Sequence, residues 1–177
     1  APKLPATTLA VRCYSYMFDG CTNLKEAPKL SAETLASDCY YSMFYGCTNL
    51  KEAPKLPATT LAVRCYSYMF SGCTNLKEAP KLSATTLANS CYSSMFSGCT
   101  NLSSVTMLAP SDQISGNRFT DWLTNAGTDG NITRTLILTD QNAYKELANK
   151  SSYLPDNWKI GSEGTTVQDA LGNAITE

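Results

Sequence analysis

One stretch of this chain returns at a fixed interval, and that regularity limits the folds that the chain can adopt. The first copy reads CYSYMFDGCTNLKEAP, and the copies begin 26 residues apart, at Cys13, Cys39, Cys65 and Cys91. A period of about 20–50 residues is typical of supersecondary units that stack on one another. The units 1–26, 27–52, 53–78 and 79–104 align without gaps. We therefore expect four stacked coils over residues 1–104.

The first half of each unit has the spacing of a helix. In the first unit Leu9, Cys13 and Met17 follow one another at intervals of four residues and would form one apolar stripe. A threonine precedes the stripe and can cap the start of a helix, and Gly20 follows it as a stop. The pattern therefore predicts a short helix over 7–18 and over the equivalent residues of each copy.

The second half of each unit predicts a turn and a short strand. The turn covers 20–23, and the apolar residues that follow favour an extended segment over 24–30. Pro28 interrupts this segment, because proline has no amide hydrogen to donate to a sheet. The same proline recurs in every copy, so each strand is expected to be very short.

Stacking would place equivalent side chains over one another in columns. We expect Phe and Cys columns in the core, and an Asn column that bonds the backbone of neighbouring coils, with a functional Asn row as the alternative. The expected columns are Phe18, Phe44, Phe70 and Phe96; Cys21, Cys47, Cys73 and Cys99; and Asn23, Asn49, Asn75 and Asn101. One variable position reads Arg12, Asp38, Arg64 and Ser90, an alternation that avoids like charges in contact.

The pattern Met17-Phe18, Cys21 and Leu24, repeated once per unit, resembles the BspA-like leucine-rich repeats of bacterial surface proteins. In that family an Ala-Phe or Met-Phe pair, two residues, a Cys and a Leu recur in each coil. The resemblance covers 1–104. It implies an α/β fold, namely a right-handed leucine-rich-repeat solenoid, here with four 26-residue rungs of one short strand and one short helix each. It also implies export to the cell surface and a role in adhesion or ligand binding.

All eight cysteines lie in the repeats, two per unit, in the spacing C-x7-C. An even number of cysteines in an exported protein is compatible with disulfides. Buried free thiols are the alternative that we favour, because free cysteine behaves as a small apolar residue. The spacing is not that of a zinc knuckle, and the chain contains no histidine, so we expect no metal site.

The period fails after Leu102, and both tryptophans of the chain, Trp122 and Trp158, lie beyond it. We expect 105–160 to form a small α+β C-terminal cap over the open end of the solenoid, with an independent tryptophan-bearing binding domain as the alternative. Residues 161–177 are expected to form a tail, as a hairpin or a linker. The expected elements of the cap are helices over 117–126 and 140–149 and strands over 132–138 and 158–160.

Composition removes several classes of function. The net charge of −1 argues against a nucleic-acid partner, and no apolar run is long enough to span a membrane. We found no paired carboxylates, nucleophile elbow or phosphate loop, so we expect no catalytic residue, no cofactor and no enzyme. The sequence also predicts a column of tyrosines, which either forms an exposed band that binds glycan or protein or fills the edge of the core. The column comprises Tyr14, Tyr40, Tyr66 and Tyr92, with Tyr16, Tyr41, Tyr45 and Tyr68 close by.

The remaining hypothesis is a non-enzymatic cell-surface repeat module that mediates adhesion or binds a host or bacterial surface protein or glycan. Its candidate partner-binding face comprises Lys25, Glu26, Lys51, Glu52, Lys77 and Glu78. The alternative is a structural spacer or stalk that presents another domain of a larger surface protein. We expect the fragment to be a monomer at the cell surface or outside the cell, with any export signal outside this chain.

Overall fold

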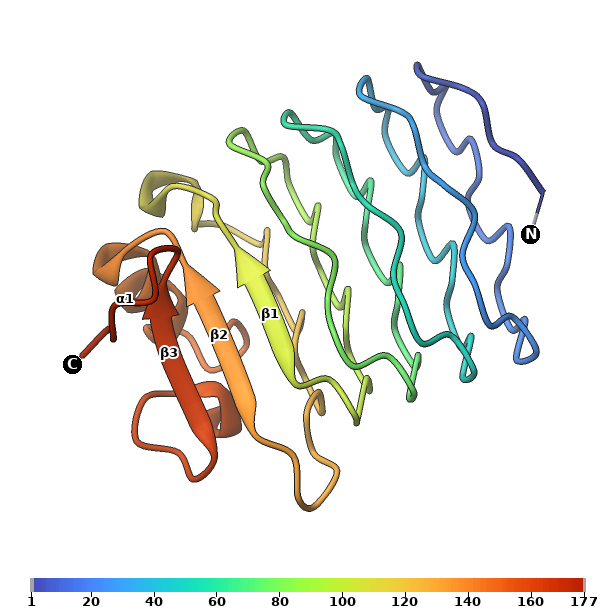
Figure 1. Ribbon diagram of the computed structural model, residues 1–177. Helices are drawn as coiled ribbons and strands as arrows, with labels where there is room; N and C mark the ends of the chain where they lie inside the picture. The colour runs from blue at the N-terminus through green and yellow to red at the C-terminus, as the bar shows by residue number, and fades with distance from the viewer. Residues whose placement is uncertain (1, 177) are drawn as a thin grey trace.

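The computed structural model describes residues 2–176 and has the form of a stack of coils. Figure 1 shows the coils side by side, from the N-terminus at one end to a small sheet and one helix near the C-terminus at the other. Each coil has a strand side, drawn in front in Figure 1, and a turn side behind it. The apolar core lies between the two sides and runs through the whole stack. The expectation of a repeat solenoid is therefore confirmed.

The strand side of the repeats is held by isolated parallel bridges instead of long strands. Glu26 pairs with Glu52, Glu52 with Glu78, and Glu78 with Ser104, each one coil further along the chain. Leu4 also pairs with Leu30. The proline between these two pairing positions lacks an amide donor, so hydrogen bonding cannot run without interruption from one to the other.

The turn side contains no helix in the described repeats, and the prediction of a helix over 7–18 is wrong. Consecutive tight turns replace it, in which Arg12, Tyr14 and Tyr16 have φ between +57° and +65°. The backbone amides alternate in their partners: Ser15 donates to Arg12 O within the coil, whereas Tyr16 donates to Tyr41 O in the next coil at 2.9 Å. A left-handed residue costs about 1–2 kcal/mol, and the hydrogen bonds between coils offset that cost.

Aromatic columns fill the space between the two sides. The rings of Phe18, Phe44, Phe70 and Phe96 are stacked, with centroids 5.5–5.7 Å apart and planes within 9° of parallel. The parallel tyrosine column has spacings of 5.9–6.2 Å. These distances lie in the range that aromatic pairs prefer, so the repeat length itself sets a favourable stacking distance.

The ladder of the turn side continues past the fourth copy. Tyr92 donates its amide to Arg118 O, and Phe96 donates to Trp122 O at 2.9 Å. Residues 105–126 thus add a fifth coil, and the predicted helix over 117–126 is wrong for the same reason as in the repeats. These hydrogen bonds cross the boundary that the sequence pattern indicated at residue 104.

A three-stranded parallel sheet, of order β1-β2-β3, closes the strand side. The described elements are β1 (Ser104–Met107), η1 (Ser111–Gln113), β2 (Arg134–Leu138), α1 (Gln141–Ala148), η2 (Asp156–Trp158) and β3 (Thr165–Asp169). The predicted strand over 132–138 and the helix over 140–149 are confirmed as β2 and α1. The Asp140 carboxylate caps α1 by accepting from the Ala143 amide at 2.8 Å. The predicted strand over 158–160 is wrong, because the chain forms the short 3-10 helix η2 there.

Both tryptophans belong to the core. The ring of Trp122 donates from Nε1 to Tyr153 O, and Trp158 donates to Ala126 O at 3.1 Å. Because neither side chain is exposed, the alternative of a tryptophan-bearing contact surface is wrong. The end of the chain forms a hairpin, in which Gln168 pairs antiparallel with Ala174. No helix of residues 2–176 is long and apolar enough to cross a membrane.

Candidate binding face on the strand side

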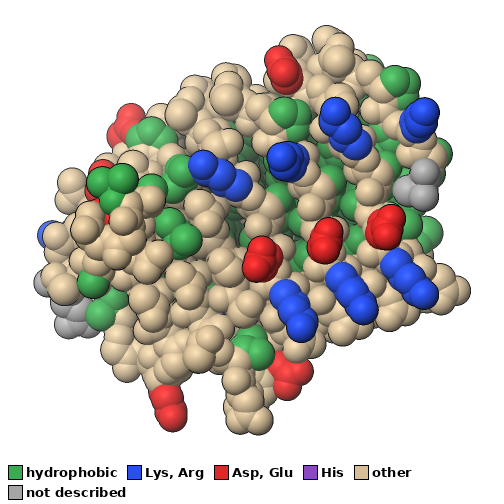
Figure 2. Space-filling view, in the orientation of Figure 1, with side chains coloured by type: hydrophobic (Ala, Val, Ile, Leu, Met, Phe, Trp, Pro, Cys, Tyr) green, Lys and Arg blue, Asp and Glu red, His purple; other side chains and the backbone are tan. Residues whose placement is uncertain are grey.

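The six residues predicted to face a partner all lie exposed on the strand side. The three lysines occupy one position of the repeat and the three glutamates the next, and the bridges between Glu26, Glu52 and Glu78 keep them in register. Figure 2 shows a row of acidic side chains between two rows of basic side chains on this face. Lys29, Lys55 and Lys81 are exposed three positions beyond the glutamates in the sequence.

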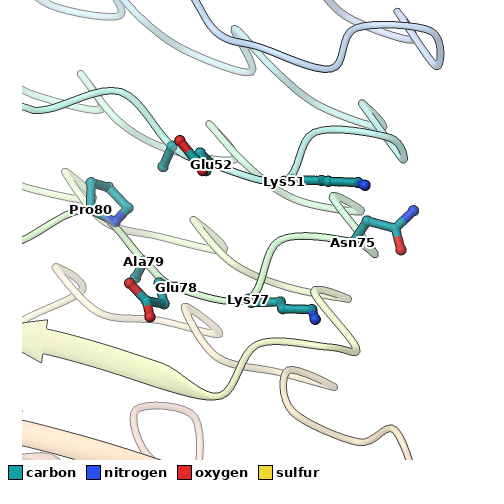
Figure 3. Close-up of a pocket in the computed structure, with 8 residues that line it drawn as sticks. Lys51, Glu52, Asn75, Lys77, Glu78, Ala79 and Pro80 are labelled. Atoms are coloured by element: carbon teal, nitrogen blue, oxygen red, sulfur yellow. The ribbon is translucent and has the colours of Figure 1, made fainter.

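A hollow of about 650 Å³ lies on this face between the segments 51–53 and 75–80, which belong to neighbouring coils. Figure 3 shows Lys51 and Lys77 side by side, with Glu52 and Glu78 side by side on the following positions. The structure thus brings four of the six predicted residues to one depression. Its lining consists of Lys51, Glu52, Ala53, Asn75, Lys77, Glu78, Ala79 and Pro80.

The charged groups of this face do not neutralise one another in the structure. Within residues 2–176, ion pairs join only Arg64 to Asp38 and Lys159 to Asp156, and neither pair lies in the hollow. Like charges in register repel one another. A bound partner with complementary charges would relieve that repulsion, whereas exposed pairs within the chain contribute little.

Asparagines link the coils beside this face. The side-chain amides of Asn49, Asn75 and Asn101 donate to Thr22 O, Thr48 O and Thr74 O, one coil back, each at 2.8 Å. A backbone carbonyl in a turn has no partner from regular secondary structure, so each asparagine supplies one. Of these three asparagines, only Asn75 also borders the hollow. Its hydrogen bond to Thr48 O holds its side chain at the edge of the depression.

The turn cysteines form a parallel column of free thiols. Cys47, Cys73 and Cys99 are buried and donate from Sγ to the carbonyl oxygen of a phenylalanine in the preceding coil, at 3.0–3.1 Å. All eight cysteines of the chain are free. Burial raises the pKa of the Cys47 thiol to about 11 and that of Cys99 to about 12. Since the thiolate is the nucleophile and the metal ligand, these thiols are chemically inert in the folded protein.

The predicted tyrosine column has a structural role in the described chain. Tyr40, Tyr66 and Tyr92 are buried in the stacked tyrosine column, so this column fills the core. Residues 2–176 contain no group of three or more Cys, Asp or Glu side chains that could hold a metal ion. A second hollow near β2 is crossed by Arg134, whose guanidinium bonds Gly127 O and Asn157 O at 2.7–2.8 Å and so holds the cap together.

The four tyrosines expected beside the tyrosine column lie on the turn side, and three of them are exposed. Tyr16 is 56% exposed there and Tyr68 is 37% exposed, with Val11, Met17, Tyr45 and Val63 also open to solvent. The signal for this surface was present in the sequence, because the order of Ser and Tyr changes between otherwise matching coils.

The stacked coils, the buried columns and the exposed charged rows define a repeat solenoid of the kind that offers an extended surface for binding. Residues 4–126 match the family described as BspA type leucine rich repeat region (6 copies), which confirms the resemblance noted in the sequence. The chain therefore belongs to this family, and the match extends over the fifth coil. No curated protein and no solved structure matches the chain.

Proposed function

We propose that this protein is a non-enzymatic interaction module of a cell surface, and that its strand side mediates adhesion by binding a surface protein or glycan. The observation that carries this proposal is the set of in-register rows of exposed Lys and Glu side chains, which have no ion-pair partner within residues 2–176. Such a face is arranged for a partner outside the chain. Membership of a repeat family that typically lies at surfaces supports the cell-surface or extracellular location.

The charge of the face favours a partner with excess negative charge. Lysines occupy two rows on the strand side, at positions such as Lys51 and Lys55, whereas glutamates occupy the single row that contains Glu52. Complementary potentials raise the association rate and select the partner more than they add affinity. Binding at this face should therefore weaken as ionic strength rises.

The test is a binding measurement against surface proteins and glycans immobilised as an array, with three forms of the chain. The first is the unchanged protein, the second carries Lys25→Glu, Lys51→Glu and Lys77→Glu, and the third carries Arg at the same three positions. We expect the Glu form to lose the signals that the unchanged protein gives, and the Arg form to keep them. Equal binding by all three forms would contradict the assignment of this face.

A spacer is the second candidate, and one observation favours it. The first and third copies differ at one position only, Asp19 against Ser71, whereas recognition generally requires coils that differ. A spacer would give no array signal in any of the three forms. It would, however, impose a fixed distance between domains fused to its two ends, which can be measured by energy transfer between two attached dyes.

A further inference from the structure

The differences between coils gather on the turn side. The strand-side sequence KEAPKL is identical at 25–30, 51–56 and 77–82. On the turn side the equivalent dipeptides read Ser15-Tyr16, Tyr41-Ser42, Ser67-Tyr68 and Ser93-Ser94. Tyrosine thus changes places with serine between neighbouring coils, and it disappears from the fourth coil.

This exchange brings three tyrosines into one continuous row. The ring centroids of Tyr16 and Tyr41 are 5.4 Å apart, and those of Tyr41 and Tyr68 are 5.6 Å apart, with planes tilted by 59° and 54°. The serines fill the vacated positions and are bound to the backbone: Ser15 Oγ donates to Asp38 O, in the next coil. The row is therefore fixed in place and open to solvent.

A charged column runs beside the tyrosines. Arg64 binds Asp38 through two bonds, from Nε to Oδ1 at 2.8 Å and from Nη2 to Oδ2 at 3.1 Å. Arg12 occupies the equivalent position one coil before Asp38 and two coils before Arg64. Its side chain is exposed and forms no ion pair with a residue of 2–176. Since Arg64 already pairs with Asp38, the Arg12 guanidinium is free to bind an anion from outside the described chain.

These groups line a shallow pocket of about 530 Å³, formed by Arg12, Ser15, Tyr16, Asp38, Tyr41 and Arg64. Its walls offer aromatic faces, hydroxyl groups, a fixed carboxylate and one free guanidinium. Burial, together with the neighbouring tyrosines, raises the pKa of Tyr41 further above neutral pH. A tyrosine hydroxyl is protonated at neutral pH in any case and can donate a hydrogen bond. Pockets with a few convergent polar groups among aromatic side chains are typical of small-ligand sites.

We propose that this turn-side pocket binds an acidic saccharide, a sugar ring that carries a carboxylate. The Arg12 guanidinium would bind the carboxylate in the two-pronged geometry that arginine favours. The apolar face of the ring would lie against Tyr16 and Tyr41. This site is independent of the strand side, because it uses none of the lysines or glutamates of that face.

The fourth coil supplies substitutions that the fold already accepts. Ser90, Ser93 and Ser94 occupy there the positions of Arg12, Ser15 and Tyr16. The variants Arg12→Ser and Tyr41→Ser therefore convert single positions to the residues that another coil carries. Lys145→Ala, at an exposed position of α1, removes the same charge far from the pocket in sequence and serves as the matched control.

The test uses trigalacturonate as the acidic probe and its fully methyl-esterified form as the neutral probe, with binding followed by NMR of the backbone amides. We expect trigalacturonate to shift the signals of 12–16 and 38–41. The ester, Arg12→Ser and Tyr41→Ser should each weaken binding by about tenfold or more, the effect of losing one contact to a charged or stacked group. Lys145→Ala should bind as the unchanged protein does.

Three results would overturn the proposal. One is equal binding of the ester and the acid, which would remove the role of the carboxylate. Another is full binding by Arg12→Ser. The third is the absence of any shift at 12–16 and 38–41 when trigalacturonate is added at millimolar concentration to the unchanged protein.

Discussion

The side-chain amide of Asn75 donates a hydrogen bond to the carbonyl oxygen of Thr48 in the preceding coil, at 2.8 Å. Replacing this asparagine by alanine leaves the carbonyl without its partner and should lower the free energy of unfolding by about 1 kcal/mol. Urea denaturation measures the loss. Asn23→Ala is the internal control, because Asn23 bonds no carbonyl of a described residue, and its effect should be close to zero. An equal loss in both variants would contradict the role of the column.

The exposure of the thiols predicts two classes of reactivity. Cys21 is exposed and Cys13 is half-buried, whereas the other six cysteines are buried. We expect a thiol reagent to modify Cys21 rapidly in the folded protein, Cys13 more slowly, and all eight only after denaturation without reductant. Mass spectrometry of the modified peptides distinguishes the sites. Fewer than eight modified thiols in denaturant would show that disulfides had formed.

The raised thiol pKa values predict a loss of stability at alkaline pH. The pKa of Cys39 and that of Cys47 rise from 9.0 to about 11, because burial disfavours the charged thiolate. Between these values the unfolded chain releases protons that the folded chain retains. The stabilising effect is thus complete below pH 9.0 and is lost as pH rises toward 11, by about 1.4 kcal/mol per unit for each thiol.

Urea unfolding at a series of pH values, with reductant present, tests this dependence. The variant Cys47→Ala should show a shallower decline with pH than the unchanged protein, even if its stability is lower throughout. A slope that Cys47→Ala does not alter would contradict the assigned cause.

Two glycines with the same backbone conformation should respond differently to alanine. Gly20 and Gly127 have φ of +67° and +63°, but a β-carbon at Gly20 would meet no atom within 4 Å. At Gly127 it would lie 2.8 Å from Leu102 O and 2.9 Å from the Arg134 side chain. We expect Gly20→Ala to cost about 1 kcal/mol and Gly127→Ala about 3 kcal/mol, the second including overpacking. Thermal denaturation compares the two, and equal losses would contradict the steric argument.

The repeat period predicted the stacking of Phe44 on Phe70 because equivalent residues of identical coils can only recur by translation. The same period did not distinguish a helix from a ladder of turns. Met17 and Phe18 occupy buried or edge positions in either conformation. Whether the backbone forms a helix or a ladder of turns depends on hydrogen bonds to carbonyl groups of the next coil, which the sequence of one unit does not reveal. The 3-10 helix that ends at Trp158 was not predicted for a similar reason, because the apolar ring favoured a strand over 158–160.

The candidate site also has one part that the sequence predicted and one part that it did not. Repetition alone predicted that Lys51 and Lys77 would lie in one row on an exposed face. It did not predict the hollow, whose lining also includes Ala53 and Ala79. Tyr16, Tyr41 and Tyr68 were expected near the tyrosine column, but the row that they form was not, because Tyr41 joins Tyr16 only through contact between coils.

The backbone hydrogen bonds that join the tight turns of neighbouring coils run forward along the stack, as from the Phe18 amide to the Met43 carbonyl. The forward end is occupied, since the Asp121 amide of the fifth coil donates to Ser152 O. Because each coil presents acceptors to the coil before it and donors to the coil after it, two coils of this kind can join only front to back. The ladder therefore gives the stack a polarity that every added coil must follow.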